Sequence, residues 1–181
     1  MNPSLLLISG WAHGIDAIQP MGDALSDHFD VHLLTGSAVL KSRHIPDADY
    51  IVTGSMGGLL AMELLPESCK KLVLISSTAK FCATEGYPCG TPEKVLRRMI
   101  LQLKRDPEGV LDAFFKNVHF PFRESRQAIS MRENTPDDMD ALAAGLDYLL
   151  ASDIREKAPG IDLPVLLLHG SEDRIIPSTA S

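Results

Sequence analysis

One serine, set in a glycine-rich turn between an apolar run and a helical pattern, constrains this chain more than any other feature. Residues 49–65 read DYIVTGSMGGLLAMELL. The residues at 50–53 favour a strand, and those at 59–65 favour a helix. A sharp strand-to-helix turn exposes a serine hydroxyl but strains the backbone, so small residues must flank it. Ser55 is therefore predicted to be a nucleophile.

Two alternatives for this turn are a phosphate-binding loop and an ordinary glycine-rich connection. The turn lacks the GKS or GKT of a P-loop and does not match G-x-G-x-x-G. Gly57 stands at the expected small position two residues after Ser55. Thr53 occupies the matching position before it, where glycine is usual. Threonine is small enough to be tolerated there.

Five short apolar runs are typical of parallel strands buried on both faces. They are residues 5–9, 31–35, 50–54, 72–76 and 165–169. Helical spacing at 15–28 and 58–66 alternates with these runs, which predicts an α/β parallel sheet. Residues 36–49 form a short polar connection with little room for a full crossover helix.

The stretch between the fourth and fifth runs differs in kind from the rest of the chain. Helical patterns occur at 93–105, 109–117 and 137–150, and no strand pattern interrupts them. Residues 78–160 are therefore predicted to be a helical lid, inserted in a core made of residues 1–77 and 161–181.

Composition narrows the function classes. The net charge of −7 argues against nucleic acid as the partner. The apolar runs are too short to cross a membrane, and the start, MNPSLLLISG, does not resemble a signal peptide. The three cysteines form no CxxC pair, which indicates free thiols in a reducing, cytoplasmic setting rather than a disulfide or zinc site.

Charge is unevenly distributed. Residues 94–132 hold nine of the seventeen lysines and arginines but only four acids. Such a basic surface on an acidic protein can attract an acidic macromolecule. The alternative is a solvated helix face without a partner.

Two further segments complete a candidate catalytic set. A glycine-containing loop follows the first strand run, where an oxyanion hole draws one of its N–H donors. This predicts the backbone N–H groups of Trp11 and Met56 as the donors; the alternative for Trp11 is a core tryptophan. Asp173 follows the last run, where the acid of a Ser–Asp–His triad is found, and is preferred to Glu172; the alternative is an acidic surface turn.

In this order the segments resemble the α/β-hydrolase superfamily and, within it, the pimeloyl-[acyl-carrier protein] methyl ester esterases of biotin synthesis. The matching stretches are Gly10-Trp11, GSMGGL at 54–59, LVLISS at 72–77, GLDYLLASDIR at 145–155 and the run from 163 to 177. They span nearly the whole chain. The GLDYLLASDIR stretch and Gly-Tyr-Pro at 86–88 are more specific to the esterases than the turn and acid motifs are.

The resemblance implies a serine carboxylesterase that hydrolyses the methyl ester of a pimeloyl chain on acyl carrier protein, with no metal or organic cofactor. It implies that Phe114 and Phe115 line the acyl channel. Together with the basic window, it predicts that lid arginines meet the acidic carrier protein: Arg97, Arg98, Arg123 and Arg126.

The sequence departs from the family at the catalytic base. The family's base is a histidine on a loop beyond the acid, and no residue here matches it. The chain is accordingly expected to lack the C-terminal strand and helix. His13 could contact substrate and His169 is expected to be structural, but neither has the spacing of the base. Two alternatives therefore stay open: another α/β-hydrolase acting on small esters, and an impaired member that binds without turnover.

Overall fold

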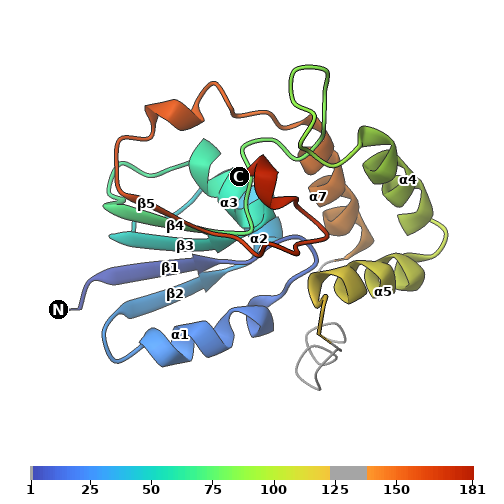
Figure 1. Cartoon of the computed structure of the whole chain (residues 1–181). Coiled ribbons are helices and arrows are strands. Elements are labelled where there is room, and N and C mark those ends of the chain that lie inside the picture. The colour runs from blue at the N-terminus through green and yellow to red at the C-terminus, as the bar shows by residue number, and fades with distance from the viewer. Residues whose placement is uncertain (1, 123–137) are drawn as a thin grey trace.

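The computed structural model describes residues 2–122 and 138–181 (Figure 1). Its centre is one five-stranded sheet with the strand order β2-β1-β3-β4-β5, and every adjacent pair is parallel. The strands are β1 (Ser4–Ile8), β2 (Asp30–Leu34), β3 (Tyr50–Gly54), β4 (Lys71–Ile75) and β5 (Val165–Leu168). The predicted parallel α/β sheet is confirmed, with strand ends within one residue of those expected.

Short helices connect the first four strands: η1 (Ile15–Ala17), α1 (Gln19–Leu25), α2 (Gly36–Ser42) and α3 (Met56–Glu63). The connection after β2 was expected to leave little room for a crossover helix, yet it contains the seven-residue α2. The Thr35 side chain caps α2 by accepting a hydrogen bond from the N–H of Ala38, and α2 ends at Arg43 in the left-handed region. Two turns of helix therefore fit between β2 and β3.

Three longer helices lie in the insertion between β4 and β5: α4 (Glu93–Leu103), α5 (Pro107–Val118) and α7 (Met139–Ala151). Aspartates cap two of them, since Asp106 accepts from the N–H of Gly109 and Asp138 from that of Ala141. In Figure 1, α4, α5 and α7 stand together at one end of the sheet.

The beginning of the insertion is less helical than expected. Residues 78–92 form a loop held by isolated bridges, including one between Cys82 and Thr91. Among the described residues of the insertion, β pairing is limited to these isolated bridges.

The core is formed by aliphatic side chains of the inner strands and of α3, including Leu6, Ile8, Ile51, Leu59, Leu60 and Leu72. Strand β5 is different, because it is an edge strand. Its four apolar side chains, Val165 to Leu168, are 42–54% exposed, so β5 contributes little to the core. None of the helices that the structure describes is long and apolar enough to cross a membrane.

Candidate active site

Ser55 lies between the last residue of β3 and the first residue of α3. Its backbone has φ 52° and ψ −120°, a region that side-chain-bearing residues rarely adopt. Two hydrogen bonds hold this conformation: the Ser55 N–H donates to the carbonyl of Ile75 at 2.9 Å, and the Gly58 N–H donates to the carbonyl of Ser55 at 2.9 Å. The backbone strain predicted for a nucleophile turn is therefore present at Ser55.

The small residues around Ser55 are required by close packing. A Cβ atom on Gly57 would lie 2.6 Å from the carbonyl oxygen of Ser9, and one on Gly58 would collide with the Ser77 hydroxyl. Thr53 is tolerated because its side chain is buried and its hydroxyl donates to the carbonyl of Val73 at 3.3 Å. The turn therefore keeps its shape without glycine at that position.

The two predicted oxyanion donors come from different parts of the chain, the start of α3 and the loop after β1. Met56 is the first residue of α3, so its N–H has no acceptor within the helix and lies at the positive end of the helix dipole. Trp11 lies in the loop after β1. The indole Nε1 of this residue donates to the carbonyl of Leu142 in α7 at 2.8 Å. This bond fixes the loop after β1 against the insertion.

Two cavities meet at Ser55, and both also contact Phe114 and Ile175. The first, of about 470 Å³, contains Glu172 and Asp173, and we call it the acidic cavity. The second, of about 660 Å³, is called the arginine cavity after three of its residues: Arg98, Arg105 and Arg174. Ser55 is thus accessible from two chambers of opposite charge.

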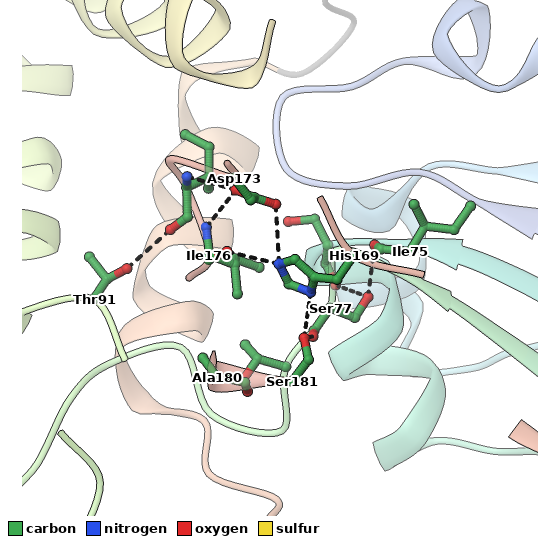
Figure 2. A network of polar contacts seen from close by, with 11 residues as sticks. Ile75, Ser77, Thr91, His169, Asp173, Ile176, Ala180 and Ser181 are labelled. Atoms are coloured by element: carbon green, nitrogen blue, oxygen red, sulfur yellow. Dashed lines mark hydrogen bonds and ion pairs between the residues drawn. The ribbon is translucent and has the colours of Figure 1, made fainter. Parts of the chain in front are cut away.

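Asp173 is held by its own loop and by a histidine (Figure 2). Its Oδ1 accepts hydrogen bonds from the N–H groups of Ile175 and Ile176 at 2.8 and 2.9 Å. Its Oδ2 lies 3.3 Å from Nε2 of His169. The His169 ring is further fixed by the carbonyl of Ile176, 2.8 Å from Nε2, and by the hydroxyl of Ser181, 2.5 Å from Nδ1. Both ring nitrogens of His169 are therefore engaged by its own loop and by Ser181, and its structural role remains a prediction.

His13 is the histidine that the acidic cavity shares with Ser55. Its Nδ1 lies 2.8 Å from the carbonyl oxygen of Trp11, and its ring packs edge-on against Phe114 and Phe115. Burial lowers the pKa of His13, and nearby His119 lowers it further, while the bond to Trp11 opposes the shift. The imidazole is consequently held in its neutral form.

The two phenylalanines predicted to line the acyl channel differ in their contacts with the cavities. Phe114 contacts both cavities and packs edge-on against Trp11, with ring centroids 4.7 Å apart. Phe115 is fully buried and contacts neither cavity, so it supports Phe114 rather than facing the channel.

The predicted arginines also differ from one another. Arg98 contacts the arginine cavity, whereas Arg97 is paired with Glu93 at 2.5 Å on the same helix and contacts neither cavity. Arg123 and Arg126 lie outside the described residues. The sequence analysis missed Arg105 and Arg174, although Arg105 lies in the basic window and Arg174 directly follows Asp173.

The described residues contain no group of three or more side chains that could hold a metal ion.

Comparison with known proteins gives consistent likenesses. No protein-family model matches the chain. A pimeloyl-[acyl-carrier protein] methyl ester esterase from Xanthomonas axonopodis pv. citri (strain 306) is 27% identical over 204 residues, covering 98% of this chain and 79% of that protein.

Solved structures give likenesses of the fold. An esterase from Exiguobacterium antarcticum superposes with a TM-score of 0.82 at 16% identity, covering 99% of this chain and 78% of that one. The enol-lactonase from Burkholderia xenovorans LB400 superposes with a TM-score of 0.75 at 18% identity, over 99% of this chain and 77% of that one. These matches confirm the α/β-hydrolase type of fold, and the relative above confirms the resemblance to the methyl ester esterases.

Proposed function

We propose that this chain is a serine carboxylesterase in which the hydroxyl of Ser55 attacks the carbonyl carbon of an ester. One observation carries the proposal: Ser55 has strained backbone angles at a strand-to-helix turn, where two cavities meet. Such strain is costly and persists where the surrounding structure enforces it, most often at active sites. The resemblance to carboxylic ester hydrolases supports the same assignment.

The reaction proceeds in two halves. Ser55 Oγ adds to the ester carbonyl, and the resulting oxyanion is stabilised by the N–H groups of Trp11 and Met56. The alcohol leaves with the proton that Ser55 has given up, and an acyl-serine remains. Water then attacks the acyl-serine, which releases the carboxylic acid and restores the hydroxyl.

The proton transfer needs a base, and the resemblance implies a histidine oriented by Asp173. In the part of the chain that the structure describes, no histidine nitrogen forms a hydrogen bond with Ser55 Oγ, and Asp173 faces His169 instead. We therefore expect this arrangement to acylate slowly. Triads without their base lose roughly 10⁴- to 10⁶-fold in rate.

We further propose the methyl ester of pimeloyl-acyl-carrier protein as the substrate, in biotin synthesis in the cytoplasm. The name of the Xanthomonas relative supports the substrate, and the free thiols of Cys69, Cys82 and Cys89 suit a reducing compartment. In this proposal residues 78–160 act as the lid over a core of residues 1–77 and 161–181, and the lid arginines face the carrier.

A second candidate is a hydrolase of another small ester in the same fold. The likeness to the enol-lactonase favours it, because a lactone is a cyclic ester and would need the same nucleophile and oxyanion donors. A third candidate is binding without turnover, which is favoured because, among the described residues, no histidine bonds to Ser55 Oγ.

Turnover of p-nitrophenyl acetate tests the esterase proposal. We expect a slow, saturable release of p-nitrophenol that Ser55→Ala abolishes. Ser26→Ala is the control, because Ser26 is exposed at the end of α1, remote from both cavities. Release by Ser55→Ala equal to that of the unmodified protein would exclude this esterase mechanism. Methanol release from the carrier-linked methyl ester, compared with short free methyl esters, then separates the first two candidates.

A further inference from the structure

We propose that helix α7 positions the two predicted oxyanion donors relative to each other, and that Gly145 is the positioning residue through which it does so. The inference rests on the proposed ester hydrolysis at Ser55 and adds to it the part of the molecule that sets the oxyanion hole. Gly145 itself borders neither cavity. A helix of the insertion would thus govern the rate of attack by Ser55 from outside the site.

Gly145 faces the side chains of both donor residues. It lies in the middle of α7 and is buried. A Cβ atom on Gly145 would lie 2.5 Å from Cδ1 of Trp11 and 3.4 Å from Sδ of Met56. Glycine is unfavourable in a helix interior, so its presence in α7 is explained by this close approach.

Trp11 is held by α7 through a second contact. Its indole Nε1 donates to the carbonyl of Leu142 at 2.8 Å, and both residues are buried. The ring of Phe114 in α5 packs edge-on against the same indole. Because the indole is fixed from two helices, the backbone N–H of Trp11 is restricted in direction as well.

Met56 lies between two glycines. Its Sδ faces Gly145, and its Cε would lie 2.9 Å from a Cβ atom on Gly36, the first residue of α2. The Met56 side chain is fully buried, so it has no free space into which it could shift. The N–H of Met56 is therefore held in place at the start of α3.

Helix α7 is also tied to the far end of α3. The hydroxyl of Tyr148 donates to Oε2 of Glu63, the last residue of α3, at 2.8 Å, and Oε1 of Glu63 pairs with Nη2 of Arg43 at 2.6 Å. Leu142, Gly145 and Tyr148 are spaced three residues apart, so they lie on one face of α7. This face contacts the loop after β1 and both ends of α3, so a shift of α7 would change the spacing between the two donors.

Acylation of Ser55 by p-nitrophenyl acetate, followed before the steady state, tests the inference. The rate constant of acylation reports attack on the ester, and the half-saturating ester concentration reports binding. In Gly145→Ala the indole of Trp11 must move. We expect the rate constant to fall by about 10- to 100-fold and the half-saturating concentration to change by less than about twofold. A variant with a loss of stability alone would keep both values while it stayed folded.

Gly22→Ala is the matched control. Gly22 is also a buried helical glycine, and a Cβ atom there would lie 3.2 Å from a side-chain carbon of Leu33, but Gly22 borders neither cavity. This variant should keep the acylation rate constant. Trp11 is the only tryptophan of the sequence, so its emission maximum reports the indole directly. The maximum should shift in Gly145→Ala and stay in place in Gly22→Ala.

Trp11→Phe tests the same point by a second route, and it does so even where Gly145→Ala fails to fold. It keeps an aromatic ring next to Phe114 but removes the hydrogen bond to the carbonyl of Leu142. We expect the acylation rate constant to fall by about threefold to tenfold, again without a matching change in the half-saturating concentration.

An unchanged acylation rate constant in Gly145→Ala or, where that variant does not fold, in Trp11→Phe would overturn the inference. An equal loss in Gly22→Ala, or a change confined to the half-saturating concentration, would overturn it as well. Failure of the esterase proposal would look different, because p-nitrophenol release would then survive Ser55→Ala. The two failures are therefore distinguishable.

Discussion

Oδ2 of Asp173 lies 3.3 Å from Nε2 of His169, a residue four positions earlier in the same loop region (Figure 2). In a Ser–Asp–His triad, a carboxylate oxygen of the acid holds the ring of the base. Here that oxygen faces a histidine whose ring is fixed by the carbonyl of Ile176 and the hydroxyl of Ser181. The Asp173 carboxylate is thus held in one orientation, and the histidine that it contacts is His169.

Replacing Asp173 separates its structural role from its electrostatic role. Asp173→Asn keeps an oxygen that can accept from the N–H groups of Ile175 and Ile176 but removes the charge. We expect it to lower esterase turnover while changing the free energy of unfolding by less than about 1 kcal/mol. Asp173→Ala leaves both N–H groups without their acceptor and should cost about 2 kcal/mol. Urea unfolding and ester turnover of both variants check this; equal stability losses would contradict the assigned loop contacts.

Gly57→Ala should destabilise the protein although alanine usually favours helices. The added Cβ would lie 2.6 Å from the carbonyl oxygen of Ser9 and 3.0 Å from that of Ile8, and both belong to backbone that cannot move freely. We expect a loss of about 1–3 kcal/mol in the free energy of unfolding. Gly160→Ala is the control, since a Cβ there meets nothing within 4 Å. Thermal unfolding that ranks the two variants in the opposite order would refute the packing described for the turn.

His13 should make stability depend on pH. Its pKa is lowered in the folded state from the ordinary value of 6.5, so the unfolded chain binds the proton more readily. Its contribution to stability is fully present above about pH 6.5 and declines as the pH falls below that value.

Denaturant unfolding between about pH 5 and 7.5 measures this effect. The slope of stability against pH should be flatter in His13→Gln than in the unmodified protein. His44→Gln, at an exposed position, should retain the original slope. Identical slopes in all three proteins would show that His13 is not held neutral by burial.

The sequence predicted the strands well because each is a short continuous apolar run, and the runs of the inner strands are buried. It did not predict that β5, at the edge of the sheet, leaves its apolar side chains partly exposed. Strand β3 begins and ends at the predicted residues, and Ser55 lies at the predicted turn. The turn could be recognised because its glycines mark it in the sequence, and the structure shows why Gly57 is needed: a Cβ there would lie 2.6 Å from the carbonyl oxygen of Ser9. The resemblance to the esterases was likewise carried by short motifs.

Three features were not predictable from the sequence, and the physical reason differs between them. Helix α2 was missed because seven residues give little hydrophobic periodicity. The Thr35 cap that begins it is a single local contact. Phe114 and Phe115 are adjacent residues of the same type, so the sequence does not show which of them reaches the cavities. The direction of each ring in the folded protein decides it. The approach of Arg174 to the arginine cavity depends on how the last loop crosses the insertion.

Mass spectrometry of the acylated protein tests the central claim, that Ser55 is the nucleophile, most directly. Because no histidine bonds to Ser55 Oγ in the described structure, both acylation and hydrolysis of the acyl-serine should be slow. p-Nitrophenolate leaves without a proton, so acylation should be slowed less than hydrolysis, and the acyl-serine should accumulate when the protein is mixed with p-nitrophenyl acetate and quenched in acid. The account predicts a single added acetyl group on the peptide containing Ser55, and none on that peptide in Ser55→Ala. An acetyl group found instead on His13 or Cys89, or an unmodified Ser55 peptide while p-nitrophenol is released, would contradict it.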